Sequence, residues 1–124
     1  MNEKQFLELS DRECNLLIYS VLYDAYPYHK MKDGLALLKR HVGIHLVPDY
    51  KNTWQGLGKG IEHANENGFY YKLTVYPENH ECIWQIEDVS YSGIKLYPDH
   101  AYNLDAAIKF AFWIAYMKAL GVLE

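Results

Sequence analysis

Residues 103–120 read NLDAAIKFAFWIAYMKAL, the longest run in the sequence in which apolar residues recur at helical spacing. Asn103 is a favourable N-cap, Asp105 complements the positive end of a helix dipole, and Gly121 supplies a C-terminal stop. The pattern therefore predicts a helix from Asn103 to Leu120. Its apolar residues occupy two sides, and one face cannot bury all of them. We expect this helix to lie deep within the fold, or to have one side against a partner chain.

The second apolar side of this helix favours self-association. Phe110, Trp113 and Met117 extend the apolar surface beyond the part of the circumference that a core needs. Exposed apolar patches often mark interaction sites, and aromatic residues are enriched at interface centres. We therefore predict a homodimer in which Phe110, Trp113 and Met117 are interface residues. The alternative is a cover within one chain, provided by the first helix through Leu17, Ile18 and Val21.

Length and composition predict one domain covering residues 1–124, because 124 residues that are 50% hydrophobic can bury a sufficient core without disulfides or a metal. Cys14 and Cys82 lie far apart in regularly patterned segments, which favours reduced thiols in the cytoplasm of a host cell. The N-terminal residues lack an apolar leader, and the apolar run between Lys109 and Lys118 is too short to span a bilayer. We expect a cytoplasmic protein that does not enter the membrane.

The net charge of −4 is unevenly distributed. Residues 62–105 contain Lys72 and Lys95 against eight carboxylates, so this region alone has a net charge of −6. Such a region does not favour nucleic acid, and it leaves room for electrostatic steering between two proteins. A solvated acidic surface is the simpler interpretation.

Two further helices are predicted before the middle of the chain. Ser10 and Glu13 form a capping box, and the apolar stripe that follows ends before Pro27. The second helix starts after Asp49 or Asn52 and ends at Asn67–Gly68, and its inward residues are Trp54, Leu57, Ile61 and Ala64. Gly56, Gly58 and Gly60 are unusual there, because each glycine costs about 1 kcal/mol relative to alanine. Their role stays open between a loosely formed helix and a tightly packed one.

The strand candidates are Phe69–Tyr76, Cys82–Val89 and Ile94–Tyr97, with Ile44–Val47 as an edge strand or extended connector. They predict an antiparallel meander with one dry face and one mixed face. The fold class is therefore α+β, with a three-stranded or four-stranded antiparallel sheet packed with helices, and the N-terminal and C-terminal helices flanking it. Trp84 on the dry face and Phe112 on the last helix are predicted core residues.

The segment 23–40 combines tyrosines with basic residues. Aromatic rings stack on bases and lysines neutralise phosphates, so this segment is where a nucleotide or another small ligand would bind. The candidate ligand-binding residues are Tyr26, Tyr28, Lys30, Lys32 and Arg40. The simpler interpretation is a short helix from Met31 to Val42 whose basic residues face water.

No pattern in the sequence predicts catalysis, a metal or a cofactor. The run QGLGKG at residues 55–60 does not have the spacing of a phosphate-binding loop, and His41 and His45 are separated by Gly43 and strand-like residues. Neither a serine nucleophile motif nor an exposed cysteine beside a histidine is present. We therefore expect a protein that is not an enzyme.

The second half of the chain resembles a known family. Pro48-Asp49-Tyr50, a helix with Trp54, Asn67-Gly68-Phe69 opening a strand, Trp84, and a last helix with repeated alanines follow in the order found in small phage-encoded α-β-α sandwich domain proteins. The resemblance covers roughly Pro48 to Gly121 and does not include the segment 23–40 or the three glycines. It implies a sheet flanked by helices in a phage or prophage accessory protein, a group without a common activity.

Together these observations predict a non-enzymatic phage or prophage accessory protein that acts by binding a host or phage protein. Inhibition of a host defence factor is one such role. The alternative is a nucleotide-binding or small-molecule-binding protein that uses the segment 23–40.

Overall fold

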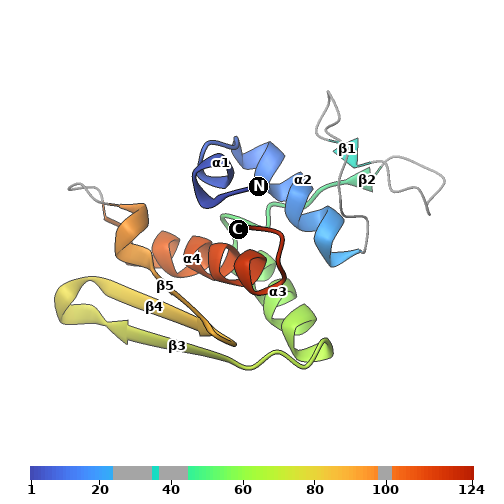
Figure 1. Ribbon diagram of the computed structural model, residues 1–124. Helices are drawn as coiled ribbons and strands as arrows, with labels where there is room; N and C mark the ends of the chain where they lie inside the picture. The colour runs from blue at the N-terminus through green and yellow to red at the C-terminus, as the bar shows by residue number, and fades with distance from the viewer. Residues whose placement is uncertain (24–34, 37–44, 98–101) are drawn as a thin grey trace.

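A computed structural model describes residues 1–23, 35–36, 45–97 and 102–124 of the protein (Figure 1). The fold is α+β, as expected, with an antiparallel three-stranded sheet and helices near both ends of the chain. The elements in order are α1 (Glu3–Leu7), α2 (Asp11–Leu22), β1 (Leu35–Ala36), β2 (His45–Leu46), α3 (Trp54–Glu66), β3 (Tyr71–Tyr76), η1 (Pro77–Asn79), β4 (Glu81–Ile86), β5 (Val89–Ser92), η2 (Gly93–Leu96) and α4 (Leu104–Ala119).

Helix α4 is the centre of the molecule. It lies on one face of the sheet, while α1 and α2 lie on its other side and α3 packs near its C-terminal end (Figure 1). The predicted cap is present, because the Asn103 side chain accepts a hydrogen bond from the Ala106 amide. Phe112 is fully buried and packs edge-on against the ring of Trp84 on β4, with the ring centroids 5.0 Å apart. The predicted core residues Trp84 and Phe112 are therefore confirmed.

The prediction that Phe110, Trp113 and Met117 are interface residues is wrong, because all three are buried within the single chain. The ring of Phe110 stacks on Phe6 of α1 at 5.7 Å, and the Trp113 indole nitrogen donates to the carbonyl oxygen of Tyr50 at 3.0 Å. The second apolar side of α4 is thus covered from within, by α1 and the segment before α3 as well as by the hydrophobic cluster that includes α2. This surface is not available for a homodimer.

The sheet has the order β3-β4-β5, with both pairs antiparallel. Cys82, Trp84 and Ile86 of β4 face α4 and are buried, whereas Gln85 on the opposite face is exposed. The predicted division into one dry face and one mixed face is confirmed. We call these the helix face and the open face.

The predicted second and third strands have wrong boundaries. The chain turns back at Glu87–Asp88, where Glu87 has a φ of 51° and Ile86 pairs directly with Val89. Most of the stretch Ile94–Tyr97, expected to be a strand, lies instead in the short helix η2 (Gly93–Leu96). The reason is Tyr91, whose ring is buried opposite Trp84, so that the stretch expected to be a turn continues the sheet.

The first half departs from expectation in two places. Helix α1, capped by Asn2, was not expected, and α2 starts after Ser10 as predicted. Leu35–Ala36 pairs antiparallel with His45–Leu46, so these two residues form a strand where a helix was expected, because the pairing supplies their backbone hydrogen bonds. The strand expected at Ile44–Val47 is confirmed at His45–Leu46, in a separate two-stranded sheet.

Helix α3 is capped by neither of the two predicted residues, Asp49 or Asn52, and begins one residue after the later of them would place it. Its N-cap is Thr53, whose hydroxyl oxygen accepts from the Gly56 amide at 2.9 Å. Trp54 was predicted to point inward, but it is 50% exposed and lies within 5.3 Å of the Lys109 ammonium group, measured to the ring centroid. The first turn of α3 therefore presents Trp54 to the surface and Gly56 to the core.

Close packing explains two of the three glycines of α3. A Cβ atom at Gly56 would collide with the backbone of Tyr50, and one at Gly60 would collide with the rings of Phe112 and Trp113. A Cβ atom at Gly58 would meet nothing within 4 Å. The glycines thus allow α3 to approach α4 and the segment before it, which decides the open question in favour of a tightly packed helix.

The glycines provide a matched pair of variants. Gly58→Ala should stabilise the protein by about 0.5–1 kcal/mol through helix propensity alone. Gly60→Ala should destabilise it, because overpacking against Phe112 and Trp113 costs about 1–3 kcal/mol. Urea unfolding measures both values. Equal stabilisation by the two alanines would show that α3 does not press on α4 at Gly60.

None of the helices in the described ranges is both long enough and apolar enough to cross a membrane.

Candidate functional site

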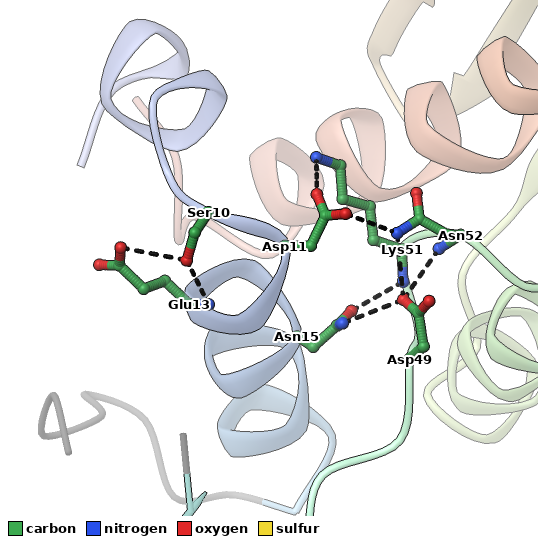
Figure 2. A network of polar contacts seen from close by, with 7 residues as sticks. All are labelled: Ser10, Asp11, Glu13, Asn15, Asp49, Lys51 and Asn52. Carbon is green, nitrogen blue, oxygen red and sulfur yellow. Dashed lines mark hydrogen bonds and ion pairs between the residues drawn. The ribbon is translucent and has the colours of Figure 1, made fainter. Parts of the chain in front are cut away.

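A polar cluster joins the start of α2 to the segment that leads into α3 (Figure 2). We call it the Asp49 cluster, formed by Asp11, Asn15, Asp49, Lys51 and Asn52. The Asn15 amide group donates to Oδ1 of Asp49 at 3.0 Å, and its oxygen accepts from the Lys51 backbone amide at 2.8 Å. Because Asn15 is buried, these bonds have little competition from water.

An ion pair closes the cluster on its exposed side. Lys51 Nζ lies 2.7 Å from Oδ1 of Asp11, and the Asn52 side-chain amide donates to Oδ2 of Asp11 at 3.0 Å. Lys51 Nζ also lies 4.4 Å from the ring centroid of Phe110. The hydrogen bond from Lys51 holds the pKa of the Asp11 carboxyl below its ordinary value of 3.8, although partial burial opposes the shift.

Local sequence rules place these side chains. Ser10 caps α2 by accepting from the Glu13 amide at 3.1 Å, which puts Asp11 in the first turn. Asp49 Oδ1 accepts from the Asn52 amide at 3.2 Å, a turn typical of aspartate, and the Thr53 hydroxyl donates to the carbonyl of Asp49. The polar groups of the cluster are thus used to fix the entry of the chain into α3.

A second lysine is neutralised nearby. Lys109 of α4 is buried, and its Nζ lies 2.9 Å from Asp105 and 3.0 Å from the carbonyl oxygen of Asn52. Its ammonium group also lies over Trp54, as described above. Both cations that border the cluster are therefore held by partners within the chain, which leaves no cation of this cluster to bind a phosphate.

The two thiols of the described residues are buried, and His63 is paired with a tyrosine. Burial raises the pKa of the Cys14 thiol to about 12, and burial also raises the pKa of Cys82. His63 Nδ1 lies 2.6 Å from the hydroxyl of Tyr116, whose pKa burial raises to about 12. No group of three His, Cys, Asp or Glu side chains in the described ranges has an arrangement that could hold a metal ion.

The predicted ligand-binding residues Tyr26, Tyr28, Lys30, Lys32 and Arg40 lie outside the described residues. The ligand-binding interpretation of this segment therefore stays a prediction.

Strand β3 carries a surface that sequence patterning did not reveal. Three large hydrophobic side chains on and beside it are exposed: Tyr70 at 65%, Leu73 at 37% and Tyr76 at 46%. Leu73 belongs to the helix face, opposite the buried Trp84, yet it stays exposed because α4 packs mainly on β4 and β5. Alternation correctly assigned Leu73 to the dry face, but it could not show that the covering helix lies mainly over β4 and β5.

The backbone of β3 is also free along one edge. Glu87 donates its amide to the carbonyl of Tyr70 at 2.9 Å, which fixes the alternation of the ladder. Lys72, Thr74 and Tyr76 therefore direct their amides and carbonyls toward β4, whereas Tyr71, Leu73 and Val75 direct theirs away from it. No other strand of the described residues pairs with this edge. We call the free edge together with Tyr70, Leu73 and Tyr76 the β3 surface.

Comparison with known proteins adds no relative: no family model, no curated protein and no solved structure matches the chain. The resemblance to phage-encoded α-β-α sandwich domain proteins therefore stays a prediction.

The Asp49 cluster should contribute to stability through Asn15. Asn15→Ala removes two partly buried hydrogen bonds and leaves the Lys51 amide without its side-chain acceptor, which should cost about 1–3 kcal/mol in denaturant unfolding. Asn65→Ala, on the exposed side of α3, is the matched control and should change stability by less than about 0.5 kcal/mol. Equal effects of the two substitutions would show that the cluster does not hold α2 to the segment before α3.

The ion pair of Asp11 should give a pH-dependent contribution. Its pKa is lowered in the folded protein, so the contribution is present above pH 3.8 and is lost as the pH falls through the folded-state value. Asp11→Asn should cost about 0.2–1 kcal/mol at pH 7, because the carboxylate is largely exposed, and the difference should close in acid. Glu66→Gln, on the exposed surface of α3, serves as the control. A cost independent of pH would contradict the ion-pair origin.

Proposed function

We propose that the protein acts by binding another protein chain, which adds an extended segment to β3. The observation that supports this is the β3 surface, where an unpaired strand edge and exposed apolar side chains occur together. Strand addition uses both features, because main-chain hydrogen bonds supply affinity while alternate side chains supply specificity. The Asp49 cluster does not compete as a binding site, since its polar groups are engaged within the chain.

The proposal concerns binding without catalysis. Among the described residues the thiols are buried and His63 is paired with Tyr116, whereas the exposed β3 surface offers amides, carbonyls and apolar groups. Such groups suit recognition of a peptide backbone and do not activate a nucleophile. We place this activity in the cytoplasm, where Cys14 and Cys82 stay reduced.

The origin of the protein in a phage or prophage, and a host defence factor as its target, are part of this proposal. They rest on the resemblance in the order of motifs from Pro48 to Gly121. A small protein that offers a strand edge is physically suited to such a role, because it can cover a strand or an extended segment of a larger factor.

Affinity capture with variants of Leu73 tests the proposal. Leu73→Pro removes an outward-facing amide at an edge position where proline is tolerated, whereas Leu73→Ile keeps the amide and the apolar side chain. A protein captured from host lysate by wild type and by Leu73→Ile should be lost with Leu73→Pro. In hydrogen exchange, this partner should slow the amides of Tyr71, Leu73 and Val75.

Circular dichroism establishes that Leu73→Pro is folded before capture is compared. A partner that Leu73→Pro retains equally, or one that protects a different segment from exchange, would contradict strand addition at β3. The absence of any stoichiometric partner in host lysate would count against the binding function itself.

A further inference from the structure

We call Tyr71, Leu73 and Val75 the outward-facing residues of β3, because their backbone amides and carbonyls point away from β4. They are arranged almost symmetrically about Leu73. Residues 70–76 read YYKLTVY, with tyrosine at both ends and leucine in the middle. Tyr71 and Val75 are equidistant from Leu73, and these three residues carry the free amides and carbonyls. A strand with this layout is complementary to itself when it runs antiparallel to a copy.

We propose that a second copy of this chain pairs with β3, antiparallel, about a two-fold axis that passes through Leu73. Leu73 then lies opposite Leu73 of the second copy, and Tyr71 lies opposite Val75. Each of these pairs can exchange both of its backbone hydrogen bonds, so every outward-facing group of the strand finds a partner. The two sheets join into one continuous sheet across the axis.

Lys72 selects this register over its neighbours. A shift that puts the axis at Lys72 places two lysines directly opposite each other, which is destabilising, and leaves Val75 without a partner. A shift that puts the axis at Thr74 leaves Tyr71 unpaired. With the axis at Leu73, each Lys72 faces a threonine, and every outward-facing residue is used.

The exposed side chains support the same register. On the open face, Tyr70 of one copy lies opposite Tyr76 of the other, an aromatic pair of the kind that stabilises antiparallel sheets. On the helix face, Leu73 meets Leu73 at the place that α4 leaves uncovered. The second copy therefore covers all three exposed hydrophobic residues on and beside β3, namely Tyr70, Leu73 and Tyr76. In Figure 1, β3 borders the molecule, and no described helix or strand lies along its outer edge.

This inference rests on the proposed function, because it names the chain that adds to β3. It differs from the homodimer expected from sequence, whose interface residues on α4 are buried. A different protein that adds a strand to β3 would have to compete with the second copy for the same amides.

Charge reversal at the axis tests the inference. Leu73→Lys and Leu73→Glu each place like charges opposite one another, so each should weaken self-association at least about tenfold relative to wild type. Mixing the two variants in equal amounts should restore the dimer, since lysine then faces glutamate. Ile94→Lys is the matched control, because Ile94 is 38% exposed on η2, close to the 37% of Leu73, and it should dimerise like wild type.

Sedimentation equilibrium over a concentration series measures these outcomes against the monomer mass of 14.5 kDa. Hydrogen exchange tests the same inference on the wild-type protein, without a variant. The exchange of the amides of Tyr71, Leu73 and Val75 should slow as the protein concentration rises. If the wild-type protein is monomeric at every concentration, the proposed pairing with a second copy is overturned. It is also overturned by a dimer that survives in both Leu73 variants, or by one that mixing fails to restore.

The two proposals fail separately. If wild type is monomeric while a captured protein still protects the amides of β3, only the second copy is overturned. If no chain of either kind protects these amides, strand addition itself is overturned.

Discussion

The backbone of Tyr50 lies between α3 and α4, and much of the fold depends on this contact. Its carbonyl accepts the hydrogen bond from the Trp113 indole, and Gly56 packs against the same backbone without room for a side chain. Both Tyr50 and Trp113 are buried, so an unpaired indole or carbonyl there would cost about 1–3 kcal/mol. The Asp49 cluster holds this segment from the other side, through Asn15 of α2. The polar network of Figure 2 therefore serves the burial of α4.

The sequence predicted the elements whose signals are local. The caps of α2 and α4 follow from Ser10 and Asn103, because a capping side chain and its amide lie within one turn. The dry face of the sheet followed from alternation at Trp84 and its neighbours. The partners of α4 are set by tertiary contacts. Phe6 and Tyr50 cover the side of α4 that looked available for a second chain. Phe6 lies in a helix too short to have a periodic pattern, and Tyr50 lies in a segment without regular structure.

The hairpin between β4 and β5 shows where local signals mislead. Glu87 adopts a positive φ, a conformation that glutamate rarely has, so no turn was expected there. The serines and the glycine of residues 90–93 looked like a turn, but Tyr91 between them is buried among the side chains of the helix face. Gly93 then lies against the sulfur of Cys82, where a side chain would collide. Burial of one tyrosine outweighed the preferences of its neighbours.

The exposure of β3 follows from the dimensions of the parts. A helix with its side chains is about 10 Å wide, and neighbouring strands lie about 4.8 Å apart, so one helix covers about two strands. Helix α4 packs mainly on β4 and β5, and α3 packs on α4. When a single helix covers a three-stranded sheet, one strand stays partly exposed on the helix face. That strand is β3, and since its backbone edge is free as well, a neighbouring strand can supply the cover that a second helix would provide within the chain.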